Sequence, residues 1–196
     1  MDAQKVTFLT LLILRFYARC FVYPYSEQQY ELQHIFREME NEPVSDEEAE
    51  HLEVILSIIN QYQGQDIKNI REDFVLTFTD VYSNQSYCPL LAGDFSTRFK
   101  IDYDPQPLLD LFLENGLTVT ADESFDSIIN YLDYLSLLYE QFLGGEIEFL
   151  VIEEFVNGHV LNWIPLLCQQ AAQFSNLALY KEAAQGLRQF LLWLCT

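Results

Sequence analysis

Apolar residues recur at steps of three and four along most of this chain, the spacing that places them on one face of an α-helix. In the segment 3–22, for example, Val6, Leu9, Ile13 and Phe16 share a face. The same spacing predicts further helices at about 27–40, 45–62, 66–82, 108–115, 124–143, 146–157, around Trp163, and at 176–194. No segment shows the alternation typical of a strand. The pattern predicts an all-α, single-domain bundle of eight or nine helices over residues 1–196.

Capping residues mark two of the predicted helix starts. Ser45 and Glu48 have the spacing of a capping box, in which each side chain bonds the backbone N–H of the other residue. Thr120 and Glu123 repeat this spacing ahead of the next long apolar pattern. Both helices should therefore begin at these positions.

The stretch "GHVLNWIPLL", residues 158–167, interrupts an otherwise helical pattern. Pro165 lacks a backbone donor and clashes with the preceding turn of a continuous helix. It is tolerated in the first turn of a new helix. His159 and Trp163 lie one helical turn apart, so both rings can share a face. We expect a corner between two helices, held by Trp163.

The segment 83–104 shows no sustained periodicity, and we expect it to be irregular. Long irregular segments of compact domains tend to carry function. Residues 100–122 follow, with Pro105, Pro107 and Gly116, and form a candidate hinge. Exchange of helices across such a hinge would produce a dimer, so both a monomer and a helix-exchanged dimer are expected forms.

The chain is strongly acidic, with 30 Asp and Glu against 10 Lys and Arg and a formal net charge of −20. A surface this negative repels nucleic acid and favours basic partners. Eight of the sixteen residues from Glu38 to Glu53 are acidic. This stretch is interpreted either as a solvated helix end or as a landing surface for a basic peptide, and the two interpretations are compatible.

The beginning of the chain and its cysteines favour the cytoplasm. The apolar run 6–14 resembles part of a signal peptide, but Asp2 precedes it and no cleavage site follows. No apolar stretch is long enough to cross a membrane. The four cysteines have neither metal-ligand nor C-x-x-C spacing, which is typical of reduced core thiols.

Two Glu-x-x-His motifs, Glu31 to His34 and Glu48 to His51, are the motif type that di-iron helical bundles use. Glu31 and His34 lie off the apolar stripe of their helix, and His51 only borders its own. We therefore prefer surface histidines, with a helical di-metal carboxylate protein as the alternative. No nucleophile elbow or phosphate loop is present, so we expect no enzymatic activity and no cofactor.

Several stretches resemble the TorD/DmsD/NarJ family of redox-enzyme maturation chaperones. "FVNGHVLNWIPLL" and "FSNLALYKEAA" are similar to the family's C-terminal signature. "DFVLTF", residues 73–78, resembles its acidic-aromatic element, and the Tyr23-Pro24 turn resembles the joint of its first helix pair. The matching signature residues are Phe155, His159, Trp163, Phe174 and Tyr180.

Two elements depart from the family pattern. Of the usual Pro-x-x-Ser-x-Tyr loop, only Pro89 can be placed. The family's Asp-His pair stands here as Glu123-Ser124, which disfavours the weak guanine-nucleotide site proposed for the family.

The resemblance implies a cytosolic chaperone that binds the twin-arginine signal peptide of a molybdenum enzyme, and its apo-form, until the cofactor is loaded. Under this interpretation, Asp73 and Glu123 face the basic end of the peptide. Phe74, Phe78, Pro89 and Trp163 would border an apolar groove, and His159 would support the corner. An interaction module that kept the fold and lost peptide binding is a further alternative.

Overall fold

The computed structural model describes residues 1–79, 88–114 and 125–196, and its regular elements are all helical. The ten α-helices in these ranges are α1 (Phe8–Cys20), α2 (Gln28–Met39), α3 (Asp46–Gly64), α4 (Ile67–Phe74), α5 (Ala92–Phe99), α6 (Gln106–Glu114), α7 (Ile128–Leu143), α8 (Phe149–Phe155), α9 (Ile164–Phe174) and α10 (Ala178–Leu194). Three short elements are the 3-10 helix η1 (Ala3–Lys5) and the π-helices η2 (Val75–Thr79) and η3 (Val156–Val160). The predicted all-α class is confirmed.

The described part of the chain has ten α-helices rather than eight or nine, because α5 lies inside the segment 83–104. This helix has eight residues and buries Ala92, Phe95 and Ser96. Two turns are too short to repeat an apolar stripe, so the periodicity did not reveal it. Lys100 ends α5 in the left-handed conformation, with φ of 55°.

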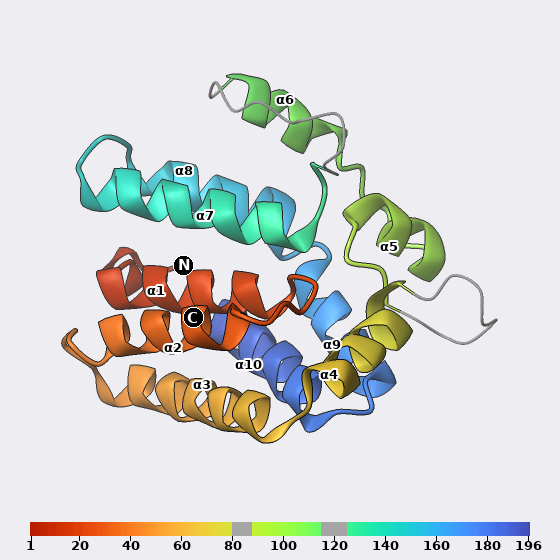
Figure 1. Ribbon diagram of the computed structural model, residues 1–196. Coiled ribbons are helices and arrows are strands. Elements are labelled where there is room, and N and C mark those ends of the chain that lie inside the picture. Colours follow the sequence, from red (N-terminus) through yellow and green to blue (C-terminus); the bar gives the residue numbers. More distant parts are fainter. Residues whose placement is uncertain (80–87, 115–124) are drawn as a thin grey trace.

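Helix α1 is the centre of the bundle, packed between α2 and α7, with α10 behind it (Figure 1). Neighbours on three sides bury α1 around most of its circumference, so the one-sided face predicted from the sequence was too narrow. Its buried residues are Leu9, Thr10, Leu11, Leu12, Ile13, Leu14, Phe16, Tyr17, Ala18 and Cys20.

Helices α3 and α10 run antiparallel against each other. Ser57 donates a hydrogen bond to Glu182 near one end of the pair, and Trp193 donates one to Glu47 at the other. Gly186 permits the close approach, because a Cβ there would lie 2.9 Å from a methyl group of Val54. The start of α3 is thereby held beside the end of α10.

Local signals placed two boundaries correctly. The Ser45 hydroxyl accepts from the backbone N–H of Glu48, whose carboxylate accepts from the N–H of Ser45, so the predicted capping box is confirmed. Pro165 lies in the first turn of α9, and Trp163 is the N-cap of this helix, which confirms the predicted corner. The second predicted start was wrong, because α7 begins at Ile128, and its N-cap Ser127 accepts a hydrogen bond from the N–H of Asn130 at 3.3 Å. The residues of the predicted capping box, Thr120 and Glu123, lie outside the described residues.

The candidate hinge is described over residues 100–114 and includes α6. Leu108 is buried, and the Phe112 ring packs on Tyr134 of α7 with 5.0 Å between centroids. The rest of the hinge, 115–122, lies outside the described residues, and helix exchange stays a prediction. None of the described helices combines the length and apolar character needed to cross a membrane.

Candidate functional site

Asp73, predicted to face the basic end of a peptide, is buried at the end of α4. Its carboxylate accepts hydrogen bonds from the Ser175 hydroxyl at 2.6 Å and from the backbone N–H groups of Asn176 and Leu177 at 2.8 and 3.2 Å. These donors form the turn between α9 and α10, so Asp73 fixes this turn from a distant part of the chain. A peptide could reach the carboxylate only by replacing these bonds.

Phe74 and Phe78 lie in the core beside Asp73. Their ring centroids are 5.0 Å apart, and both rings pack on Tyr180 of α10 at 5.9 and 5.5 Å. Tyr23 packs edge-on against Phe74 and is half exposed, which makes it the open border of this cluster. The predicted apolar groove is closed here by the protein's own side chains.

Trp163 is completely buried, in contact with the rings of Tyr131 and Phe95 at 5.1 and 6.0 Å. Its indole N–H finds no hydrogen-bond partner among the described residues. His159 lies nearby, with Nδ1 3.3 Å from the hydroxyl of Tyr103, which is 2.8 Å from that of Tyr131. Burial lowers the pKa of His159, which favours the neutral ring.

Pro89 is also buried, next to a link between η2 and α9. The backbone N–H of Cys88 donates to the carbonyl of Thr77 at 2.6 Å, and its thiol donates to that of Leu167 at 3.4 Å. Glu123, the remaining predicted contact, lies outside the described residues. Asp73, Phe74 and Phe78 thus lie in one closed aromatic cluster, and His159 and Trp163 lie in another. The hydrogen bonds of Cys88, next to Pro89, connect η2 of the first cluster to α9, whose N-cap is Trp163.

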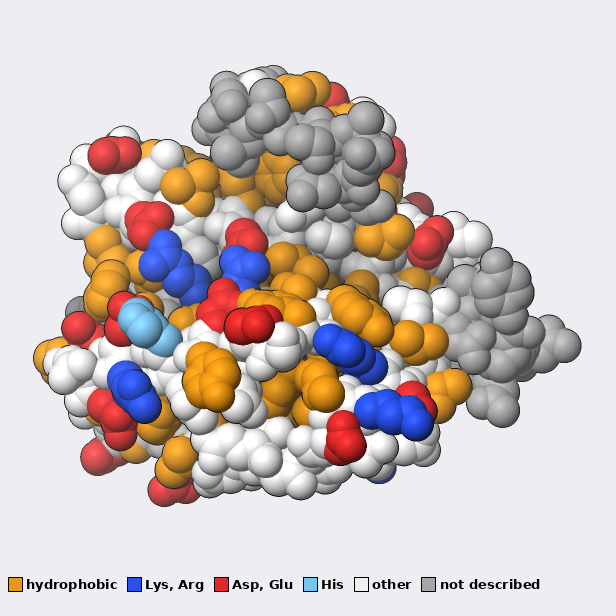
Figure 2. Space-filling model, viewed as in Figure 1, with side chains coloured by type: hydrophobic (Ala, Val, Ile, Leu, Met, Phe, Trp, Pro, Cys, Tyr) orange, Lys and Arg blue, Asp and Glu red, His pale blue; other side chains and the backbone are white. Residues whose placement is uncertain are grey.

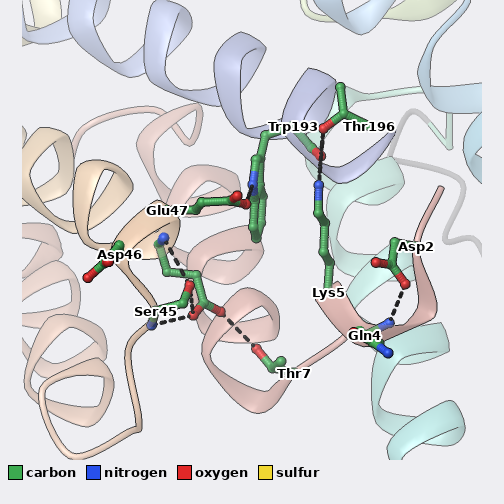
Figure 3. A pocket seen from close by; sticks show the side chains of 10 residues that line it. Asp2, Gln4, Lys5, Thr7, Ser45, Asp46, Glu47, Trp193 and Thr196 are labelled. Carbon is green, nitrogen blue, oxygen red and sulfur yellow. Dashed lines mark hydrogen bonds between the residues drawn. The ribbon is translucent and has the colours of Figure 1, made fainter.

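A surface groove lies elsewhere, where η1, the start of α3 and the end of α10 meet (Figure 3). We call its two adjoining parts the acidic half and the apolar half. The acidic half has a volume of about 700 Å³ and is lined by Asp2, Gln4, Lys5, Thr7, Ser45, Asp46, Glu47, Glu48, Trp193 and Thr196.

Three carboxylates of the acidic half, those of Asp2, Asp46 and Glu47, belong to exposed residues. Glu47 accepts a hydrogen bond from the Trp193 indole N–H at 2.7 Å, which fixes the orientation of the ring. The amino group of Lys5 lies 4.7 Å from the centroid of the same ring. The acidic half therefore already holds one cation of the chain.

The apolar half, of about 450 Å³, shares Thr7, Ser45 and Glu48 with the acidic half. Its walls include Phe8 and Val44, which are 46% and 43% exposed. Covering hydrophobic side chains that are this exposed lowers the free energy of the complex, because it removes apolar surface from water. The groove thus presents an anionic region directly beside an apolar one.

His51 lies beneath the groove, packed between Phe190 and Trp193 with ring centroids 5.2 and 5.1 Å away. It is buried, whereas the sequence placed it at the border of its helix's apolar stripe. Burial lowers its pKa, while Glu50 and Glu48 act in the opposite direction. The ring supports Trp193 from below as a neutral group.

The residues of the two Glu-x-x-His motifs are engaged elsewhere. Glu31 lies 3.7 Å from Arg19, His34 is exposed beside Glu38, and Glu48 belongs to the capping box. Within the described ranges, no group of three or more His, Cys, Asp or Glu side chains is arranged to hold a metal ion. The geometry lends no support to the di-metal alternative.

On the face seen in Figure 2, acidic and basic side chains lie together over α1, α2 and α7. Arg19 donates two hydrogen bonds of 3.0 Å to Asp133, and Arg15 pairs with Glu140. These arginines are neutralised by partners from other helices. On this face, the Arg15–Glu140 and Arg19–Asp133 pairs join α1 to α7.

Comparison of the sequence with models of known protein families finds no match, and comparison with curated proteins finds none either. The acidic stretch Glu38–Glu53 was the one sequence signal that pointed to the groove. Trp193 and Lys5 gave no signal, because their meeting depends on the packing of the chain's two ends.

Proposed function

We propose that the protein is a non-enzymatic, client-specific chaperone of the cytoplasm. Its client is a molybdenum-containing redox enzyme, whose twin-arginine signal peptide and apo-form it binds during cofactor loading and before export. The observation that supports the proposal most directly is the two-part groove, in which the acidic half adjoins the apolar half. A twin-arginine leader has the complementary order, a basic end followed by an apolar stretch.

The two halves would contribute differently to binding. Exposed carboxylates and the net charge of −20 attract the basic end from a distance and orient the encounter. Covering Phe8 and Val44 removes apolar surface from water, at roughly 1.5 to 3 kcal/mol for each side chain fully buried. The cost of ordering the peptide offsets part of this gain.

The proposal is tested by calorimetry with a synthetic peptide that carries two adjacent arginines followed by an apolar stretch. Val44→Asp is the decisive variant, because it makes the protein more negative and the apolar half less apolar. A groove that seats an apolar side chain predicts binding weakened about tenfold, or 1.4 kcal/mol. Attraction by net charge alone predicts slightly tighter binding.

Leu113→Asp is the matched control, since Leu113 is 57% exposed on α6 and lies outside the groove. It should leave the affinity within about twofold of the wild type. Equal effects of both variants would move the peptide away from the groove. If the wild type binds no leader peptide, the chaperone proposal fails and the interaction-module alternative replaces it.

A further inference from the structure

The amino group of Lys5 is held as a ligand would be, at the end of α10 (Figure 3). It donates hydrogen bonds to the backbone carbonyl of Trp193 at 2.7 Å and to the hydroxyl of Thr196 at 3.0 Å. It also lies over the Trp193 ring, whose face attracts cations. Carbonyl groups at the end of a helix carry partial negative charge, so this place favours a positive group.

The site around Lys5 is built by parts of the chain other than its own segment. Glu47 of α3 anchors the edge of the Trp193 indole, and His51 packs on the ring. Lys5 itself arrives on η1, a three-residue turn in which Ala3 and Gln4 are exposed. Glu47, His51 and Trp193 thus belong to the long helices α3 and α10, whereas Lys5 belongs to a short surface turn.

The chain itself places a basic residue in the acidic half of the groove and an apolar residue, shortly after it, at the apolar half. Lys5 occupies the acidic half, and Phe8, three residues later, borders the apolar half. A peptide in which a basic residue is followed closely by an apolar one could span the same two halves.

We propose that the ring of Trp193, the carboxylate of Glu47 and the last turn of α10 form a subsite for a cationic side chain, which Lys5 fills as an internal stand-in. An arginine of the bound peptide would displace Lys5. A planar guanidinium stacks on an indole and donates to a carboxylate and a carbonyl together, which an ammonium group does less well. This inference rests on the proposed function and names the residues that would recognise one arginine of the leader.

Lys5→Gln tests the displacement, because it removes the competing charge and keeps most of the side chain. Its control is Lys68→Gln, which changes the net charge equally. Lys68 is 78% exposed and lies 3.9 Å from Glu72 on α4, outside the groove. We expect Lys5→Gln to bind the twin-arginine peptide about tenfold tighter than the wild type, and Lys68→Gln to stay within about twofold.

Lys5→Arg is a second test, since an arginine at position 5 should bind the subsite more tightly than lysine and compete better with the arginine of the peptide. It should weaken peptide binding several-fold. If the wild type binds the peptide and neither Lys5 variant differs from Lys68→Gln, the subsite is wrong although the chaperone proposal stands.

A small probe tests the subsite without the leader peptide. The chain has two tryptophans, so the indole N–H signal of Trp193 can be assigned in an NMR spectrum by its loss in Trp193→Phe. N-acetyl-argininamide should shift this signal saturably in Lys5→Gln and at lower concentration than in the wild type. No shift in Lys5→Gln would overturn the subsite, whatever the leader peptide does.

Discussion

The aromatic clusters around Asp73 and Trp163 and the groove beside Trp193 use the same residue types in opposite ways. In the clusters, the Asp73 carboxylate is saturated by three donors and the aromatic rings are buried. In the groove, carboxylates are exposed and Trp193 is partly open beside exposed Phe8. The buried groups of a closed cluster stabilise the folded protein. The exposed groups of the groove can instead contribute to the affinity for a partner. Exposure, rather than residue type, separates the two regions.

The largest expected effect is on stability, from Asp73→Ala. Loss of three hydrogen bonds to a buried carboxylate should lower the free energy of unfolding by about 3 kcal/mol. Asp66→Ala is the control, because Asp66 caps α4 at an exposed position and should cost about 1 kcal/mol. Urea denaturation measures both. If Asp73→Ala keeps full stability but loses peptide binding, the closed cluster is the peptide site and the contrast between the regions collapses.

A medium effect is expected from salt on peptide affinity. The exposed carboxylates of the acidic half are screened by ions, since the screening length shortens from about 30 Å at 0.01 M to about 8 Å at 0.15 M salt. We expect affinity for the twin-arginine peptide to fall about tenfold over this range, measured by calorimetry. An affinity that ignores salt would contradict a role for the acidic half.

The smallest expected effect is on the pH dependence of stability. It compares two histidines, His51 under the groove and His159 in the closed cluster. Burial lowers both pKa values below the usual 6.5, so the unfolded chain takes up protons first as the pH falls. The stability contributed by each neutral ring is present above pH 6.5 and is lost as the pH falls toward the folded-state pKa. Each ring contributes at most about 1.4 kcal/mol per pH unit.

The measurement is the free energy of unfolding between pH 7.5 and pH 5 for His51→Gln, His159→Gln and the wild type. Each variant should lose less stability on acidification than the wild type does. His34→Gln, at an exposed position, is the control. A variant with the same pH slope as the wild type would show that its histidine has equal proton affinity in both states.

Sequence reasoning succeeded where neighbouring residues decide the outcome. The Ser45 capping box and the Pro165 corner depend on contacts within a few residues, and both were predicted. It missed α5, whose two turns leave no repeat to detect. It also took Asp73 for a peptide contact, because an acidic residue beside aromatic ones looks the same in sequence whether it holds a distant turn or faces solvent.

The sequence by itself determined the all-α class, the main helices and an acidic stretch at Glu38–Glu53, since these follow from periodicity and composition. Only the tertiary structure decided which aromatic faces are closed and which charged groups stay open. Glu47 and Trp193 are 146 residues apart, and Lys5 and Trp193 are 188 apart. Such pairs meet because α3 and η1 pack beside the end of α10, and local spacing along the chain carries no record of that packing.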